Sequence, residues 1–173
     1  MMLLELRKTL SGSILDLGGG GDGVIGRLYG PQVVAIDNCQ EELEEAPEGF
    51  EKQLMDAADL QFPDGSFDHV TAFYALMYMR AEEQAAALQE AYRVLTPGGS
   101  LQIWDCEIVS AYPKAFCTEL DLLLPCERFH TAYGICKLDT QDAGSIQALC
   151  AKAGFTAAAL VNCGGHFHLT CVK

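Results

Sequence analysis

Positive charge is scarce in this sequence. Lysine and arginine together number 11, against 24 aspartate and glutamate residues, so the formal net charge of the 173-residue chain is −13. Binding to a nucleic-acid backbone depends on clustered cations, and no basic patch stands out along the chain. The composition therefore argues against DNA or RNA as a partner, and equally against docking on an anionic membrane surface.

Long apolar runs and closely paired cysteines are also missing. No segment approaches the roughly 20 apolar residues of a membrane span. The start, Met1–Lys8, is too short and too charged for the apolar core of a signal peptide. Seven of the eight cysteines follow Asp105, but none forms a C-x₂–₄-C pair, so we expect no metal site. We expect a cytoplasmic protein whose cysteines are reduced and mostly buried. The alternative is that one of them is a functional thiol.

Short apolar runs alternate with helical patterns, which is typical of a mainly parallel sheet with helices on both faces. The length fits one domain over residues 1–173, at roughly 100–200 residues per domain. The patterns predict five parallel strands within residues 14–17, 33–36, 52–55, 69–74 and 100–104. They predict helices over residues 24–29, 40–45, 81–95, 114–124 and 143–153. Strands 156–163 and 166–172, joined by Gly164-Gly165, would form a closing antiparallel hairpin.

Three glycines follow the first of these strands at a spacing that suits a ligand. Gly18, Gly20 and Gly23 form a G-x-G-x-x-G pattern between a strand and a helix. Glycines there allow a tight turn and a close approach of the backbone to a bound molecule. Asp37 ends the next strand, where a carboxylate can accept both hydroxyls of a ribose. The pattern favours a nucleotide-like ligand over a plain glycine-rich turn.

The ligand could be NAD or S-adenosylmethionine, and Asp16 distinguishes them. In a dinucleotide site the helix N-terminus faces a pyrophosphate, and an acid inside the preceding strand has no role there. S-adenosylmethionine has no phosphate and carries an ammonium, a carboxylate and a sulfonium. Because Asp16 stands two residues before Gly18, it can organise the ammonium, which favours the methyl donor.

Three segments resemble class I S-adenosylmethionine-dependent methyltransferases. Ile14–Gly20 (ILDLGGG) resembles the first motif of the family, Asp56–Asp68 its D-A-x-x-L-P-F-x-D-x-S-F-D segment, and Arg93–Gly99 its R-V-L-x-P-G-G segment. The resemblance covers about residues 11–105 and is nearest to the small-molecule group that includes ubiquinone- and menaquinone-pathway enzymes. It implies a Rossmann-like, doubly wound α/β fold with a seven-stranded sheet, mostly parallel, whose last strand is inserted antiparallel.

The resemblance also implies roles for individual residues in holding S-adenosylmethionine and its product S-adenosylhomocysteine. Asp16 and the glycine loop would hold the methionine part, and Asp37 the ribose. Asn38, Asp56 and Ala57 would lie along the adenine, with Phe73 and Tyr74 near the sulfonium. The cofactor-binding residues expected are Asp16, Gly18, Gly19, Gly20, Gly23, Asp37, Asn38, Asp56, Ala57, Phe73 and Tyr74. One departure is Asp22, which stands where the family usually has glycine.

The catalytic residues are less defined, because methyl transfer needs mainly an in-line arrangement and a base only for some acceptors. Ligands bind at the carboxyl ends of parallel strands. The candidates near those ends, or in the irregular segment that follows, are Tyr74, Tyr78, Asp105 and His130, with Glu107 and Tyr133 as further possibilities. For each of them a wall, core or loop-capping role is the alternative.

Many relatives have an N-terminal helical lid, whereas here the first predicted strand starts at residue 14. We therefore expect the segment 106–141, or a second subunit of a homodimer, to close the site. The function expected is methyl transfer to a small-molecule acceptor. The alternatives are a non-catalytic S-adenosylmethionine-binding module and an NAD-dependent oxidoreductase.

Overall fold

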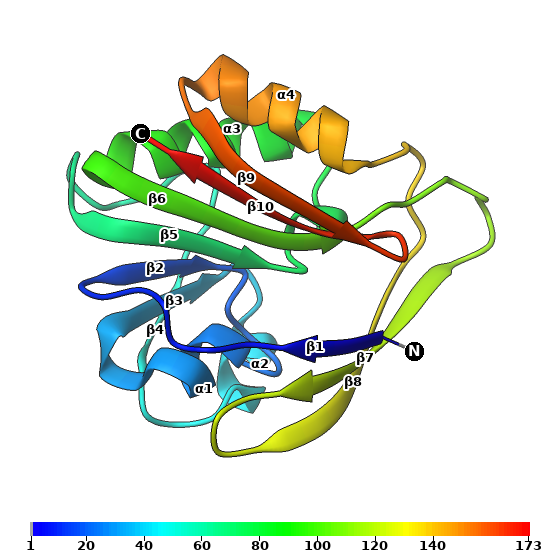
Figure 1. Cartoon of the computed structure of the whole chain (residues 1–173), viewed down its shortest axis with the longest axis horizontal. Coiled ribbons are helices and arrows are strands. Elements are labelled where there is room, and N and C mark those ends of the chain that lie inside the picture. The colour runs from blue at the N-terminus through cyan, green and yellow to red at the C-terminus, as the bar shows by residue number, and fades with distance from the viewer. Residues whose placement is uncertain (1) are drawn as a thin grey trace.

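A computed structural model describes residues 2–173 and confirms the α/β fold with a seven-stranded main sheet (Figure 1). The strand order is β4-β3-β2-β5-β6-β10-β9. Its strands β2 to β6 are parallel to one another, and β10 lies antiparallel between β6 and β9, as the resemblance implies. The strands are β2 (Ile14–Leu17), β3 (Val33–Asp37), β4 (Glu51–Leu54), β5 (Phe67–Phe73), β6 (Leu95–Cys106), β9 (Thr156–Cys163) and β10 (His166–Val172).

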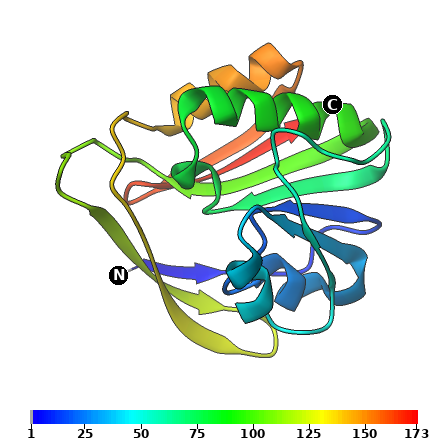
Figure 2. The ribbon, with the colours of Figure 1, turned by 180° about the vertical axis from the view of Figure 1, so that it is seen from behind.

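Helices cover both faces of this sheet. Figure 2 shows α3 and α4 side by side on one face, with α1 and α2 on the opposite side of the central strands. Their bounds, with those of two short 3₁₀ turns, are α1 (Val24–Tyr29), η1 (Gly30–Gln32), α2 (Gln40–Glu45), η2 (Leu76–Tyr78), α3 (Ala81–Val94) and α4 (Ala143–Ala153). The predicted helices agree with these bounds to within one residue, except the one over 114–124.

Local sequence explains where α3 and α4 begin and where α4 ends. At the start of α4, the Asp142 carboxylate accepts a hydrogen bond from the Ser145 backbone N–H at 2.6 Å. Gly154, at φ +111°, ends the helix in the left-handed region that glycine adopts without strain. At the start of α3, the Arg80 backbone N–H donates to the Glu83 carboxylate at 2.7 Å. The bonds at the starts of α3 and α4 thus satisfy backbone N–H groups that have no partner within the helix.

Two apolar clusters hold the layers together, one on each face of the main sheet. The first joins α3 and α4 to the sheet through fully buried residues such as Leu88, Ile103 and Ile146. The second joins α1 to the opposite face through Ile14 and Ile25. Because the central strands are buried on both faces, β2 reads as a continuous run without alternation of polar residues, apart from the buried Asp16.

A second sheet of three strands, order β1-β7-β8, was not predicted. It comprises β1 (Met2–Glu5), β7 (Phe116–Leu123) and β8 (Arg128–Ile135). The helix predicted over Lys114–Leu124 is therefore wrong, because Leu120 and Leu122 alternate with polar residues at a period of two. These two leucines pack into the same cluster as α1, which places the small sheet on that face of the molecule.

The cysteines differ from the expectation as well. All eight are free thiols, but only Cys106, Cys150 and Cys171 are buried, so the expectation that most are buried is wrong. The exposed ones are Cys117, Cys126, Cys136 and Cys163, with Cys39 intermediate. Across residues 2–173 no three His, Cys, Asp or Glu side chains are placed to hold a metal ion. None of the helices described there is long and apolar enough to cross a membrane.

Candidate active site

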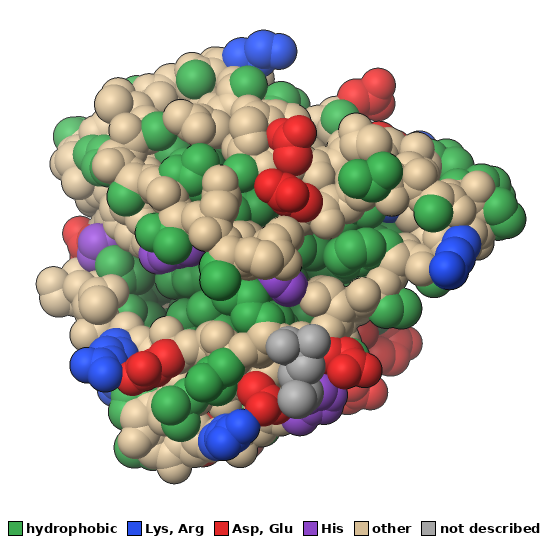
Figure 3. Space-filling model, turned by 45° about the vertical axis from the view of Figure 1, so that its right-hand side comes forward, with side chains coloured by type: hydrophobic (Ala, Val, Ile, Leu, Met, Phe, Trp, Pro, Cys, Tyr) green, Lys and Arg blue, Asp and Glu red, His purple; other side chains and the backbone are tan. Residues whose placement is uncertain are grey.

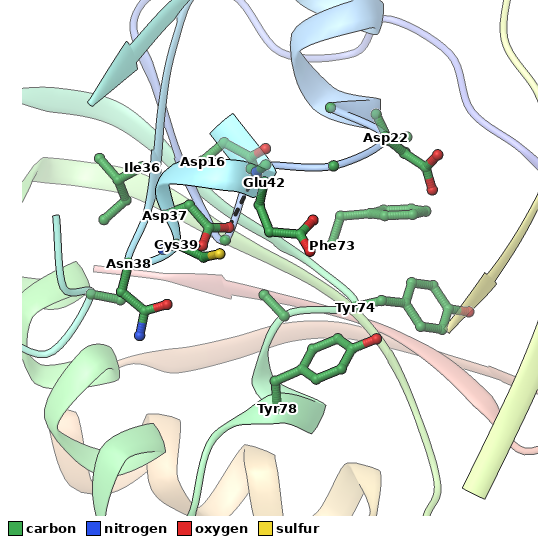
Figure 4. A pocket seen from close by; sticks show the side chains of 18 of the residues that line it. Asp16, Asp22, Ile36, Asp37, Asn38, Cys39, Glu42, Phe73, Tyr74 and Tyr78 are labelled. Carbon is green, nitrogen blue, oxygen red and sulfur yellow. Dashed lines mark hydrogen bonds between the residues drawn. The ribbon is translucent and has the colours of Figure 1, made fainter. Parts of the chain in front are cut away.

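A cavity of about 940 Å³ opens where the carboxyl ends of β2, β3 and β5 meet the small sheet. All eleven residues predicted to bind the cofactor line it, which brings together segments from Asp16 to Tyr74. Figure 4 shows Asp16, Asp37 and Glu42 close together, with Phe73, Tyr74 and Tyr78 toward the other end. This edge of an open parallel sheet is where ligands bind in such folds.

The glycine loop lies so close to its neighbours that side chains have no room. A Cβ on Gly19 would lie 2.6 Å from the Asp16 carboxylate and 2.8 Å from the Ala35 side chain. A Cβ on Gly20 would lie 2.7 Å from that of Glu42 and 2.9 Å from Asp37 Oδ2. The loop is fastened by backbone bonds from Gly19 N–H to the Ile36 carbonyl at 3.0 Å and from Gly21 N–H to the Glu42 carbonyl at 2.7 Å.

Asp37 is held in place by backbone groups. Its Oδ2 accepts from the Gly20 N–H at 3.3 Å and its Oδ1 from the Cys39 N–H at 3.0 Å. A carboxylate has about four acceptor positions, so two backbone bonds leave positions for two hydroxyl donors. The arrangement suits a ribose, whose two adjacent hydroxyls can donate to one carboxylate.

Asp16, on β2, is a buried acid that lines the cavity. It is 2% exposed, and Thr71 donates a hydrogen bond to its Oδ1 at 2.6 Å. Burial raises the pKa of Asp16 to about 7, with a further contribution from the nearby Asp37, although the Thr71 bond lowers it. Burying a carboxylate without a cationic partner is costly, so the site favours a ligand that brings a positive charge.

Asp22 ties the glycine loop to the small sheet. Its Oδ2 accepts hydrogen bonds from the hydroxyl of Thr131 and, at 3.1 Å, from that of Tyr133, both on β8. Residues Thr131 to Gly134 form one wall of the cavity. The predicted closure of the site by the segment 106–141 is thus seen in the geometry, while a second subunit over the site stays a prediction.

Aromatic rings form the far wall. Tyr74 stacks on Tyr133 with ring centroids 5.0 Å apart and 8° between the planes, and Phe73 packs against both rings. The Tyr78 hydroxyl accepts from the Gly134 N–H at 3.3 Å. Burial raises the pKa of all three tyrosines, so their hydroxyls stay protonated at neutral pH.

The other catalytic candidates lie outside this cavity. His130 is exposed on β8 and contacts Asp121, and Glu107 is exposed beyond the end of β6. Asp105 is fully buried, and burial raises its pKa to about 6. Its carboxylate accepts from the Met77 N–H at 3.1 Å and from Gln141 at 2.8 Å. Asp105 therefore holds the turn that carries Tyr78.

Several residues of the wall were not predicted. Glu42 belongs to an acidic helix whose charges are typical of a solvated face, and Thr131 lies in a segment without a motif. The side chains added by the structure include Asp22, Arg27, Ile36, Glu42, Met55, Met79, Glu83 and Thr131. Only Asp22 had a signal in the sequence, as a departure from the family pattern.

Comparison with known proteins gives the class. A family model described as "Methyltransferase domain" matches residues 15–103, so the match includes the first motif from Leu15 onward and the whole of the second and third motifs. The chain is 31% identical over 134 residues to the ubiquinone/menaquinone biosynthesis C-methyltransferase UbiE of Desulfotalea psychrophila, covering 72% of this chain and 50% of that protein. The chain belongs to the class I S-adenosylmethionine-dependent methyltransferases, as predicted, and S-adenosylmethionine is the cofactor of that family.

The chain also matches an N-methyltransferase. The chain is 29% identical over 113 residues to the phosphoethanolamine N-methyltransferase of Plasmodium falciparum, covering 60% of this chain and 42% of that one. It therefore spans about half the length of the curated relatives it matches. These relatives include both C- and N-methyltransferases, which supports the family more firmly than the ubiquinone and menaquinone group.

Solved structures agree on the fold. The PH0226 protein of Pyrococcus horikoshii superimposes with a TM-score of 0.71 at 18% identity, over 96% of this chain and 84% of that one. A methyltransferase from Mesorhizobium loti gives 0.67 at 16%, over 97% and 94%. The [4+2]-cyclase SpnF gives 0.66 at 20%, over 96% and 78%. Since SpnF is a cyclase, the fold alone does not specify the reaction.

Proposed function

We propose that this chain binds S-adenosylmethionine and transfers its methyl group to a small-molecule acceptor. The observation that carries the proposal is the convergence of a buried acid, a closely packed glycine loop and a backbone-held carboxylate on one cavity. The family match supports the donor. It also disfavours the NAD alternative, because the match reaches the two later motifs, which a dinucleotide site leaves unexplained.

The residues of the cavity suit the parts of the donor one by one. Asp16 would pair with the ammonium, and the backbone of Gly18 to Gly20 would lie along the methionine part. Asp37 would accept the ribose hydroxyls. Along the adenine would lie Asn38, Asp56 and Ala57, while Gly19 and Gly23 shape the loop and Phe73 and Tyr74 face the sulfonium. An aromatic face attracts a cation, so these rings can help to hold the charged sulfur.

When bound, the donor supplies a methyl group on a positively charged sulfur, which is a very good leaving group. The task of the protein is then to orient the acceptor in line with that methyl group and to exclude water. The rings of Phe73, Tyr74, Tyr78 and Tyr133 would position the acceptor on the side facing β8.

A small acceptor is supported by the size of the cavity and by its cover. About 940 Å³ lies within the roughly 300–1,000 Å³ of small-molecule sites, and the donor would share that volume with the acceptor. Two relatives carry names that refer to small molecules, namely ubiquinone/menaquinone biosynthesis and phosphoethanolamine. The β8 wall, fastened by Asp22, bounds the cavity on that side.

Thermal unfolding with S-adenosylmethionine, S-adenosylhomocysteine or NAD tests the donor site. A ligand at about 100 times its Kd stabilises a protein by roughly 2.7 kcal/mol, which raises the melting temperature measurably. We expect a rise with the two adenosyl ligands only. A rise with NAD alone, or with none of the three, would contradict the proposal.

A further inference from the structure

A hydrogen-bonded chain of three side chains runs from the aromatic wall toward solvent. The hydroxyl of Tyr74, after β5, lies 2.7 Å from Nδ1 of His166 at the start of β10. The Nε2 of the same imidazole lies 3.3 Å from the hydroxyl of Thr118 on β7. The three residues come from distant parts of the chain, and the proposed donor site uses only Tyr74.

The backbone of Tyr74 is in a conformation that L-residues rarely adopt. Its φ is +50°, and among residues 2–173 it is the only non-glycine residue with a positive φ. The conformation is held by a bond from its N–H to the Trp104 carbonyl at 2.7 Å and by stacking on Tyr133. Strained residues of this kind cluster at functional sites. Here the unusual backbone conformation places the ring in the cavity wall, with its hydroxyl on His166.

Both groups are in protonation states that allow a proton to pass from one to the other. Burial raises the pKa of Tyr74, so its hydroxyl keeps its proton and can donate it to Nδ1. Burial lowers the pKa of His166, so the imidazole is neutral at pH 7 and can accept. In the neutral ring one nitrogen carries the hydrogen, and with Nδ1 as acceptor the hydrogen lies on Nε2, facing Thr118.

We propose that Tyr74 and His166 form a proton relay that deprotonates the methyl acceptor. As the acceptor's X–H bond breaks, its proton goes to the Tyr74 oxygen while the Tyr74 proton goes to Nδ1 of His166. The electron pair left on X forms the new bond to the methyl carbon, and the pair of the carbon–sulfur bond stays on sulfur. The relay rests on the proposed function and adds a requirement, namely that the acceptor carries a transferable proton.

The proton has a way out. His166 is only partly buried, whereas Tyr74 is 2% exposed. Figure 3 shows a hollow between the two sheets that is lined by hydrophobic side chains and has histidines along it. The imidazolium can therefore release its proton to solvent after each turnover, while the aromatic wall keeps water from the reacting atoms.

One test needs no acceptor. Nitrogen NMR of the ¹⁵N-histidine-labelled protein with bound S-adenosylhomocysteine reports which ring nitrogen of His166 carries hydrogen. We expect the Nε2–H form, and Tyr74→Phe should shift the Nδ1 resonance by removing its donor. An Nδ1–H ring would overturn the relay, because that nitrogen could not accept a proton.

A second test compares acceptors with and without a proton. Transfer of labelled methyl is measured to catechol, benzylamine and benzyl mercaptan, and to benzyl methyl sulfide, whose thioether sulfur has no proton to lose. General acid–base groups contribute about 10²–10⁴-fold to rate. We expect Tyr74→Phe and His166→Gln to slow the proton-bearing acceptors about 100-fold and the sulfide less than threefold.

His168→Gln is the matched control, because His168 follows on the same strand and stacks on Trp104 away from the cavity. An equal loss with all four acceptors would indicate a structural role and overturn the relay, as would full activity of His166→Gln. Methylation of the sulfide without methylation of any proton-bearing probe would overturn the relay alone. Absence of stabilisation by S-adenosylhomocysteine would instead contradict the donor site.

Discussion

The two sides of the cavity are built in different ways. The side proposed to bind the donor is made of consecutive motifs between residues 14 and 57, and its key bonds are to backbone, such as those of Asp37 to the Gly20 and Cys39 N–H groups. The side proposed to face the acceptor is made by β8, and its key bonds join side chains more than 100 residues apart, such as Asp22 and Thr131. A backbone cradle suits one constant ligand, whereas a wall of side chains can change with the acceptor.

Removing the Asp37 carboxylate should have the largest effect on ligand affinity. We expect Asp37→Ala to weaken S-adenosylhomocysteine binding about 100-fold, because hydrogen bonds to a charged group are worth about 1.5–3 kcal/mol each. Isothermal titration calorimetry measures the change. Glu44→Ala, which removes an exposed carboxylate of the neighbouring helix outside the cavity, is the matched control. Equal affinities of the two variants would show that Asp37 does not hold the ribose.

The bond between the two sides is tested at Asp22. We expect Asp22→Ala to lower the free energy of unfolding by about 2 kcal/mol, since two hydroxyls lose a charged acceptor. Hydrogen exchange of the β8 amides should accelerate more than that of β2. Glu119→Ala, which removes an exposed carboxylate of β7, is the matched control and should leave the exchange of the β8 amides unchanged. Uniform acceleration over both sheets would mean that Asp22 is not a specific tie.

The pH dependence of S-adenosylhomocysteine binding tests the role proposed for Asp16. Asp16 has a raised pKa of about 7 in the free protein, so it is protonated below that pH. A ligand ammonium favours the ionised form, so S-adenosylhomocysteine should bind about tenfold more weakly at pH 6 than at pH 8, following the fraction of ionised Asp16. In Asp16→Asn the affinity should be lower at pH 8 and lack this slope. A slope retained in Asp16→Asn would assign the titration to another group.

Cysteine labelling gives the smallest perturbation. The exposed thiols Cys117, Cys126 and Cys136 belong to the segment that covers the cavity, and Cys163 lies at the β9–β10 turn. We expect these four to react with a maleimide in the native protein, counted by mass spectrometry, while Cys106, Cys150 and Cys171 react only after unfolding. Protection of the three in the covering segment would indicate that another surface packs on them.

Prediction from the sequence was accurate where structure is local. Val24–Tyr29, Gln40–Glu45 and Ala143–Ala153 were predicted with the observed ends, because caps and turns of glycine and proline lie next to each helix. The prediction of a helix over 114–124 was wrong. The apolar residues there fit both a helical and a strand period, and pairing with β1 and β8 makes the segment a strand. Motifs led to the eleven residues that line the cavity and are proposed to bind the cofactor. They did not lead to His166, because its partner Tyr74 lies 92 residues away.

Hydrophobic period, turn chemistry and short spacings were enough to predict the parallel sheet, the closing hairpin and the residues of the glycine loop. Only the folded structure shows the small sheet, the tie from Asp22 to β8 and the chain from Tyr74 to Thr118. Each of these depends on side chains far apart in sequence, whose contact is fixed only when the layers pack. Burial then sets the pKa values of Asp16, Tyr74 and His166, because desolvation exists only in the folded chain.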